Sequence, residues 1–173
     1  MTKKKKRPKG SREYISIRST SAKEFFAEVT QFGDWAPQAL VPSWNMARVP
    51  LSRRMQLYHL KGTSCVSCGL EGDMVHEERE WKHATIHFNV YHVAPDGKET
   101  MITNDHILAK SLGGTNDFDN LQPMCARCNG KKGALTAEEW EVRRSTAERQ
   151  RNASGTKRKF KWRVDEVLQP VPA

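Results

Sequence analysis

Alternating apolar and polar residues predict an antiparallel hairpin in the second half of the chain. Residues 85–93 place apolar side chains at every second position, at Ile86, Phe88 and Val90. A turn at 94–98 follows, in which Pro presets the backbone angle φ and Gly supplies a positive φ. Residues 99–106 are then expected to form the return strand.

Two shorter strands are also predicted. Residues 14–17 alternate near the N-terminus, and residues 121–124 follow a polar loop at 108–120 that is rich in Gly, Asn and Asp. Pro123 lies within the second of these strands. Because proline has no N–H to donate, it indicates a sheet edge or a break at that point.

Two helices are predicted in the first third of the chain. The first covers residues 19–32, where Ser21 and Glu24 form a capping box, and its apolar stripe contains Phe25, Phe26, Val29 and Phe32. The second covers residues 51–62, with a capping serine and a terminating glycine at Ser52 and Gly62. Between the two helices, residues 34–50 carry Pro and Trp and are expected to be irregular, with the tryptophans as packing anchors.

The C-terminal third is predicted to hold two more helices. A short one spans residues 125–133, and a longer one runs from 136 to about 150. Thr136 and Glu139 form a capping box for the longer helix, whose few apolar anchors are Trp140 and Val142. Earlier in the chain, residues 71–80 hold five acidic residues and are expected to be a solvated face or a loop.

The positive charge of this chain is concentrated at its ends. The net charge is +9, yet residues 13–142 hold 13 Lys and Arg against 17 Asp and Glu. Residues 1–12 carry seven basic residues and no acid, and residues 143–163 carry nine against one acid. Such ends favour a polyanionic partner, nucleic acid above all. The alternatives are solubilising tails or, for the N-terminal run, an import signal.

Composition narrows the class of protein. The length of 173 residues indicates one domain of ordinary size, and the hydrophobic fraction of 37% indicates a modest core. No window reaches the roughly 18 apolar residues of a membrane span, and no apolar run follows the basic N-terminus as in a signal peptide. We therefore expect a soluble protein made inside a cell, with no membrane partner.

The four cysteines form two CxxC pairs, Cys65 with Cys68 and Cys125 with Cys128. Two disulfides are one reading of this pattern. Without a signal peptide, and with both pairs at knuckle spacing, a closed four-thiolate zinc site is favoured. The pairs stand 56 residues apart, so the metal would join the two ends of the unit that contains the hairpin.

Polar residues next to the second CxxC pair suggest phosphodiester chemistry. Asp105 and His106 end the predicted hairpin, and Asn129 directly follows the last cysteine. Hydrolysis of a phosphodiester needs hard oxygen ligands for a divalent cation and a base for water, roles that suit Asp105 and His106. The amide oxygen of Asn129 could be a second ligand. Asn120 is suited to closing the polar loop, and Lys131 with Lys132 to meeting phosphate.

These motifs together resemble the HNH endonuclease family, which has the ββα-metal or His-Me finger fold. The matching motifs are Asp105-His106-Ile107, Ser111-Leu112-Gly113-Gly114, Asn116 to Asn120-Leu121, Cys65-x2-Cys68 and Cys125-x2-Cys128-Asn129-x2-Lys132-Gly133. The resemblance covers about residues 51–133 and is strongest over 103–133.

The resemblance implies a role for each matching residue. His106 would be the general base, Asp105 and Asn129 would bind the catalytic Mg²⁺ or Mn²⁺, and Asn120 would brace the loop. Structural zinc would be held by all four cysteines, Cys65, Cys68, Cys125 and Cys128. The third motif residue is often His in this family. The chain resembles its His-Asn-Asn variant, found in phage junction resolvases, and an oxygen ligand at that position favours Mg²⁺ over a softer metal.

We therefore expect an α+β fold: a small ββα-metal core with a four-cysteine zinc site, flanking helices and basic flexible termini. The expected division is a disordered basic arm (1–13), an N-terminal helical support region (14–62), the zinc-bound nuclease core (63–135), a C-terminal helix (136–151) and a basic flexible tail (152–173). Residues 69–100 are longer than the resemblance requires and would carry specificity or extend the sheet.

The expected function is hydrolysis of DNA, double-stranded above all, leaving 5′-phosphate and 3′-hydroxyl ends. Two alternatives stay open: a zinc-dependent nucleic-acid-binding module without catalysis, and an accessory protein of phage packaging or assembly. Small size and basic tails resemble enzymes encoded by phages or mobile elements, with phage or host proteins as further partners. The expected location is the cytoplasm of a bacterium or phage-infected host, with nuclear import through the basic N-terminal run as the alternative.

Overall fold

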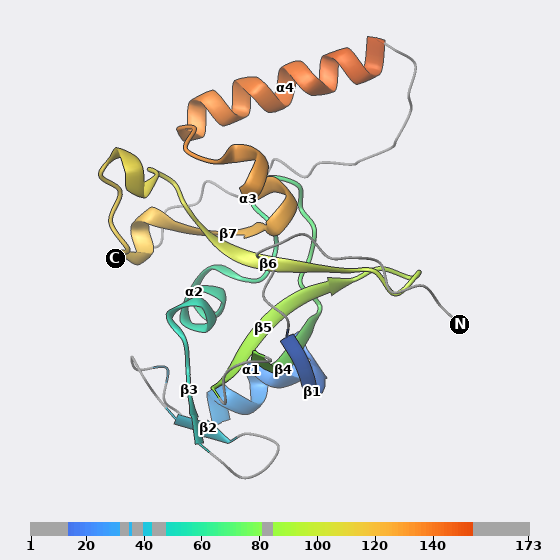
Figure 1. Ribbon diagram of the computed structural model, residues 1–173, viewed down its shortest axis with the longest axis vertical. Helices are drawn as coiled ribbons and strands as arrows, with labels where there is room; N and C mark the ends of the chain where they lie inside the picture. The colour runs from blue at the N-terminus through green and yellow to red at the C-terminus, as the bar shows by residue number, and fades with distance from the viewer. Residues whose placement is uncertain (1–13, 32–34, 36–39, 43–47, 81–84, 154–173) are drawn as a thin grey trace.

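A five-stranded antiparallel sheet in the order β1-β4-β5-β6-β7 forms the centre of the molecule (Figure 1). The computed structural model describes residues 14–31, 35, 40–42, 48–80 and 85–153. The strands of the sheet are β1 (Tyr14–Ser21), β4 (Met74–Glu80), β5 (Ile86–Val93), β6 (Glu99–His106) and β7 (Leu121–Cys125). A separate small sheet pairs β2 (Leu40–Pro42) with β3 (Arg48–Pro50).

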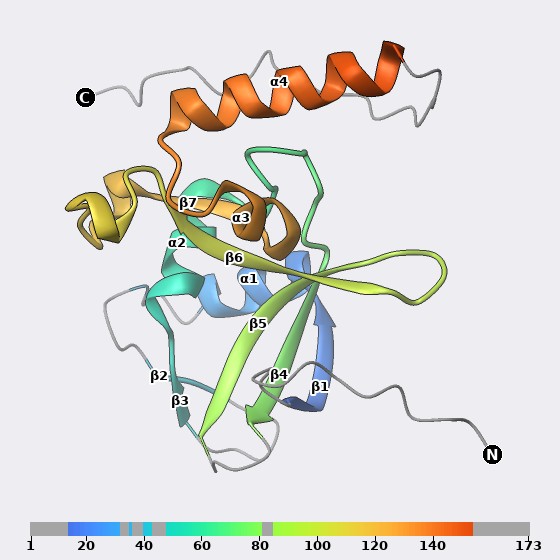
Figure 2. The same ribbon diagram turned by 45° about the horizontal axis from the view of Figure 1, so that its top comes forward.

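Among the described residues, four helices accompany this sheet, three of them beside it and the last one beyond the third (Figure 2). They are α1 (Ala22–Gln31), α2 (Arg53–Lys61), α3 (Ala126–Lys132) and α4 (Ala137–Ala153). Two short 3₁₀ turns, η1 (Lys110–Leu112) and η2 (Phe118–Asn120), shape the loop between β6 and β7. The α+β class expected from the sequence is confirmed. None of the described helices is long and apolar enough to cross a membrane.

The predicted hairpin is confirmed as β5 and β6. Val90 pairs with Ile102 in an antiparallel register, and the turn is closed by hydrogen bonds from Ala94 N to Lys98 O and from Gly97 N to Ala94 O. Gly97 has a φ of +75°, a conformation that glycine adopts at no steric cost. Strand β7 lies at the edge of the sheet beside β6, which is the position that Pro123 indicated.

The core lies between the sheet and helices α1 and α2. Phe25 of α1 packs on Phe88 with ring centroids 5.0 Å apart, and the hydroxyl of Tyr58 in α2 donates to Ile102 O at 2.6 Å. The predicted caps hold these helices, because Ser21 Oγ accepts from Glu24 N and Ser52 Oγ accepts from Met55 N. The apolar surface that both helices bury against the sheet then stabilises the fold by about 25 cal/mol per Å².

Helix α3 lies on the opposite face of β6 (Figure 2). Successive residues of a strand point to opposite faces. Ile102 is fully buried in the core, whereas the next residue, Thr103, contacts Asn129 of α3. Strands β6 and β7 therefore form a unit with α3. The face of β6 that α3 covers carries Thr103 and Asp105.

Residues 71–80 differ from the expected loop. Most of this stretch is strand β4, which pairs with both β1 and β5, and its residues Glu77 and Glu78 are buried. The carboxylate of Glu78 accepts hydrogen bonds from Asn89 Nδ2 at 2.7 Å and the Tyr91 hydroxyl at 2.9 Å. The sequence could not show these partners, because they come from a neighbouring strand whose register only the folded sheet defines.

The N-terminal region also differs from the expected helical support. Strand β1 is eight residues long and belongs to the same sheet as the hairpin, and two short strands interrupt the stretch predicted to be irregular. Trp35 does serve as a packing anchor, since its ring stacks on His59 with centroids 3.9 Å apart. Phe32, Gly33 and Trp44 lie outside the described residues.

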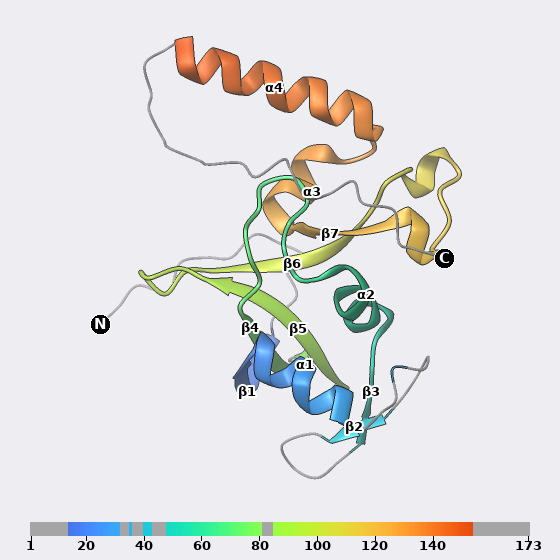
Figure 3. The ribbon, with the colours of Figure 1, turned by 180° about the vertical axis from the view of Figure 1, so that it is seen from behind.

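Helix α4 stands apart from the sheet, beyond α3 (Figures 1 and 3). Its predicted capping box is present, with Thr136 N donating to Glu139 and Glu139 N donating to Thr136 Oγ1. The prediction that Val142 anchors this helix is wrong, because its side chain is 65% exposed. Polar contacts from Trp140, Arg143 and Arg144 dock the helix instead.

Candidate functional site

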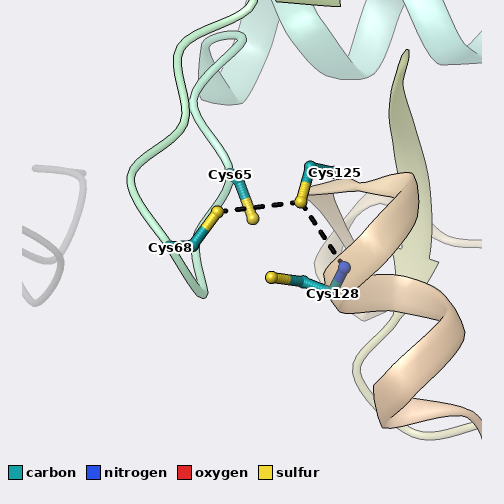
Figure 4. A group of neighbouring side chains, drawn as sticks. All are labelled: Cys65, Cys68, Cys125 and Cys128. Carbon is teal, nitrogen blue, oxygen red and sulfur yellow. Dashed lines mark hydrogen bonds between the residues drawn. The ribbon is translucent and has the colours of Figure 1, made fainter. Parts of the chain in front are cut away.

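The four cysteines come together at one point between the α2–β4 loop and the start of α3 (Figure 4). Their sulfur atoms all lie within 4.8 Å of one another, and the Sγ atoms of Cys68 and Cys125 are 3.7 Å apart. A tetrahedral zinc with Zn–S bonds of about 2.3 Å requires sulfur separations of about 3.8 Å. The donor set and its spacing therefore fit a closed metal site, and the sequence prediction that both CxxC pairs share one cluster is confirmed.

Each cysteine pair is held by its own backbone. In the first pair, Cys65 N donates to Leu70 O and Gly69 N donates to Cys65 O, closing a tight turn. Gly69 has a φ of +66°, which the turn needs after Cys68. In the second pair, Cys125 caps α3 and its sulfur accepts from Cys128 N at 3.4 Å.

Crowding makes the four thiols titrate differently. Hydrogen bonding with Cys125 lowers the pKa of the Cys65 thiol well below its ordinary value and raises that of Cys68. Contact with Cys128 lowers the pKa of Cys125 to about 7. Metal binding requires thiolates, so a cation bound here would displace the protons that these sulfurs share.

Helix α4 docks directly on the first CxxC turn. The indole Nε1 of Trp140 donates to Ser67 Oγ at 3.0 Å, and Arg144 donates to Ser67 O at 2.9 Å. Ser67 lies between the two cysteines of that turn and is itself buried. The position of α4 therefore depends on the conformation of the cysteine cluster.

Asp105 occupies a buried position near the end of β6. Its side chain is only 4% exposed, and Gln122 Nε2 on β7 donates to its Oδ2 at 2.8 Å. The ammonium of Lys132 lies 3.2 Å from the same oxygen and 3.4 Å from Oδ1. A carboxylate between two donors is held in one orientation, and the ammonium supplies the opposite charge that a buried carboxylate needs.

The structure separates the two lysines that the sequence places together at phosphate. Lys131 is exposed, whereas Lys132 has a side chain only 1% exposed. Its ammonium pairs with Asp105 and donates to His106 O at 2.7 Å. The expectation of a phosphate contact is therefore wrong for Lys132 in this structure, because its ammonium is buried and paired with Asp105.

Asn129 is oriented by Thr103. The hydroxyl of Thr103 donates to Met124 O at 2.8 Å, so its oxygen is left to accept from Asn129 Nδ2, also at 2.8 Å. A second bond, at 3.4 Å, runs from the same nitrogen to Asn104 O. Among the described residues no hydrogen bond reaches Asn129 Oδ1, so this hard oxygen is available beside the strand that carries Asp105.

His106 ends β6 and is partly exposed. Its Nε2 lies 2.9 Å from the side-chain oxygen of Asn116, which belongs to the loop between β6 and β7. The backbone is fixed on both sides of the ring, since Lys132 binds His106 O and Ile107 N donates to Asn120 O. The imidazole is thus held at the surface while the residue before it is buried.

Asn120 closes the β6–β7 loop. Its Oδ1 accepts from Leu108 N at 2.8 Å, and its Nδ2 donates to Leu108 O at 3.1 Å and Thr115 O at 2.8 Å. Gly114 allows this close approach, since a Cβ there would lie 1.8 Å from Leu108 O. These are the bonds that the predicted loop-bracing role requires.

Helix α2 supports the far end of the same loop. Lys61 donates to Phe118 O at 2.6 Å and to Leu121 O at 2.9 Å. The guanidinium of Arg53 lies 4.6 Å from the centre of the Phe118 ring, a cation–π contact. The loop that carries Asn116 is therefore anchored both by its own asparagine and by a core helix.

Sequence reasoning missed three residues of this site: Thr103, Asn116 and Gln122. Strand alternation does place Thr103 on the same face as Asp105, which was a usable indication. Gln122 could be found only from the register, which pairs it with Asp105. Asn116 was recognised as part of a motif, but its contact with His106 depends on the path of the loop.

Residues 94–143 match a family model described as HNH endonuclease. The resemblance stated from the sequence is confirmed for that segment, which carries an HNH endonuclease domain. Cys65 and Cys68 lie outside the matched residues, so the four-cysteine detail rests on the geometry of the cluster. No curated protein and no solved structure matches the chain.

Proposed function

We propose that this protein is a metal-dependent endonuclease that hydrolyses DNA with His106 as general base. The observation that carries the proposal is the arrangement at the end of β6. There Lys132 of α3 pairs with the buried Asp105 carboxylate, and Asn129 of the same helix bonds to Thr103 of β6. The strand ends at the next residue, His106, whose imidazole contacts Asn116 of the following loop. The match of residues 94–143 to HNH endonucleases supports nuclease activity in general.

The proposed reaction is an in-line displacement at phosphorus. His106 takes a proton from a water molecule, and the water oxygen forms a bond to the phosphorus as the bond from phosphorus to the 3′ oxygen breaks. The 3′ oxygen leaves with its electron pair and takes a proton from solvent. The products are a 5′-phosphate and a 3′-hydroxyl.

Asp105 and Asn129 would hold the catalytic cation, Mg²⁺ or Mn²⁺. The residues fit such an ion, because both supply oxygen and Asn129 turns its amide nitrogen away toward Thr103. When bound, a divalent cation stabilises the negative charge that develops on the phosphoryl and leaving oxygens. Lys132 pairs with Asp105 and holds its carboxylate in one orientation.

The cysteine cluster would hold structural zinc. Four thiolates leave no open coordination position, which is typical of sites that stabilise folding and do not take part in catalysis. The site joins the loop after α2 to the start of α3, and Asn129 directly follows its last ligand, Cys128. Zinc would thereby fix the position of one cation ligand.

We assign binding of the DNA backbone to the basic residues of 1–12 and 143–163 and to Lys131. The central part of the chain carries more acidic than basic residues, so it cannot supply the attraction to phosphate by itself. Lys131 is exposed on α3 two residues after Asn129, as is Arg127 two residues before it. Double-stranded DNA is the proposed substrate.

The test is cleavage of supercoiled plasmid by zinc-loaded protein in Mg²⁺ or Mn²⁺, with the ends mapped. Nicked or linear product with 5′-phosphates is expected, and His106→Ala should lower the rate at least 100-fold because acid–base catalysis is lost. Ser111→Ala, in the same loop and exposed, is the matched control. Cleavage by His106→Ala at the control rate would overturn the assignment of the base, and DNA binding without cleavage by wild type would favour the non-catalytic module.

A further inference from the structure

We propose that the side chain of Asn116 is the positioning residue of His106. It would accept the proton of Nε2 and so leave Nδ1 as the nitrogen that takes the proton from water. This inference rests on the proposed function. It assigns the orientation of the base to a residue outside the Asp105, His106, Asn120 and Asn129 set.

The contact itself defines the direction of the hydrogen bond. Nε2 of His106 lies 2.9 Å from Oδ1 of Asn116, and an amide oxygen can only accept. With the amide in this orientation, the proton of this bond would sit on Nε2. A neutral imidazole carries one N–H, so the lone pair remains on Nδ1.

Asn116 is held in place by its neighbours on both sides. Thr115 O accepts from Asn120 Nδ2 at 2.8 Å, and Asn120 N donates to Asp117 O at 3.0 Å. A weaker bond, at 3.4 Å, runs from Asp117 N to Thr115 Oγ1. Asn120 thus holds the backbone on both sides of Asn116, the residue that contacts the imidazole.

The backbone of His106 is fixed independently of the ring. Lys132 binds its carbonyl at 2.7 Å, and the next residue, Ile107, donates its N–H to Asn120 O at 2.9 Å. These contacts place the Cα of His106 but leave rotation of the imidazole free. Among the described residues, the contact with Asn116 is the hydrogen bond that restrains that rotation.

Loss of this contact should act on turnover more than on substrate binding. In Asn116→Ala we expect kcat to fall about tenfold, the equivalent of one hydrogen bond, with KM within twofold of wild type. Asn116→Asp keeps an acceptor oxygen and should recover most of the lost kcat, while its added negative charge raises KM for DNA. Ser111→Ala, in the same loop, is the control and should match wild type.

Two further measurements separate positioning of His106 from a general loop defect. In protein labelled with ¹⁵N at histidine, the His106 spectrum at the pH of the cleavage assay should show the Nε2–H form in wild type and in Asn116→Asp. In Asn116→Ala the signal should move toward a mixture of the two tautomers. In the His106→Ala background, Asn116→Ala should lower the remaining rate no further.

The outcomes are distinguishable from failure of the proposed function. If wild type shows the Nε2–H form but cleaves no nucleic acid, the positioning contact stands as a structural fact and the nuclease assignment fails. If wild type cleaves DNA but its neutral His106 carries the proton on Nδ1, the positioning proposal is overturned. A tenfold loss in Asn116→Ala that persists in the His106→Ala background would also overturn it, because Asn116 would then act through another group.

Discussion

At the scale of single residues, the buried pair of Asp105 and Lys132 has the largest consequence. Both side chains are at most 4% exposed, so neither charge is stabilised by water. Removal of one member of such a pair leaves the other charge uncompensated, and this cost exceeds the worth of the pair itself. The sequence predicts that Asp105 lies at the end of a strand, as it does in β6, but it gives no indication that the lysine after Lys131 turns inward.

Lys132→Met should therefore destabilise the protein strongly. The side chain keeps nearly the same length and loses its charge, so we expect the free energy of unfolding to fall by about 3–5 kcal/mol. Part of the loss should return on addition of Mg²⁺, which can balance Asp105 in the absence of the ammonium. Denaturant titration with and without Mg²⁺ measures both effects. Lys131→Met is the matched control, and a change of no more than about 0.5 kcal/mol is expected for this exposed site.

Thr103 gives a second prediction at this scale. Thr103→Val preserves the shape of the side chain but removes the acceptor that holds Asn129 Nδ2. The amide can then turn, so the affinity for Mn²⁺ should fall several-fold, whereas Thr103→Ser should stay near wild type. Mn²⁺ titration followed by electron paramagnetic resonance gives the affinity without any need for DNA. Equal Mn²⁺ affinity in the valine and serine variants would show that Thr103 does not orient the ligand.

At the scale of elements, the cysteine cluster connects the loop after α2, the start of α3 and the docking of α4. Local patterns predicted the existence of these elements, because caps, glycine stops and alternation are encoded within a few residues. They did not predict β4, whose buried Glu78 accepts hydrogen bonds from Asn89 and Tyr91 of another strand. They also misjudged how α4 is held. Its anchoring contacts are polar hydrogen bonds, two of which reach Ser67 in the first CxxC turn.

Removal of zinc should loosen α4 as well as the cluster. A strong chelator is expected to release one zinc per chain, expose four reactive thiols and increase tryptic cleavage after Arg143 and Arg149. The reason is that Trp140 and Arg144 bind Ser67, whose conformation the first CxxC turn defines. Thiol titration and limited proteolysis measure the two effects.

Two variants divide this prediction into its parts. Cys128→Ser should lose zinc and fold poorly, and a normally folded variant without zinc would contradict a structural role for the metal. Trp140→Phe keeps the ring but loses the N–H that reaches Ser67. It should retain zinc while tryptic cleavage within α4 increases, and protection equal to wild type would show that α4 is held by other contacts.

At the scale of the whole molecule, charge and fold are divided between different parts of the chain. The described sheet and its helices carry the candidate site, whereas seven of the 29 basic residues stand in residues 1–12. Attraction to DNA and chemistry on DNA are therefore expected to be separable. Salt dependence is the property that separates them, because it counts the phosphates that a protein neutralises.

Deletion of residues 1–12 should weaken DNA binding without changing the chemistry. The slope of log K against log salt should become less steep by up to about 6, from about 0.9 for each of seven charges. The value of kcat at saturating DNA should be unchanged. A variant with residues 1–12 in scrambled order is the matched control and should bind as wild type does, since the attraction depends on charge alone. A lower kcat in the deletion would place the arm in catalysis.

The sequence by itself determined the candidate ligands and the local elements: the two CxxC pairs, Asp105-His106 at the end of a strand, and the caps of the helices. These features depend on residue type and on spacing over a few positions, which the chain carries without folding. Only the tertiary structure decided which partner each side chain meets. Examples are the burial of Lys132, the hydrogen-bond acceptor for His106 and the formation of strand β4 by the acidic stretch. Each depends on strand register and loop path, which long-range packing sets.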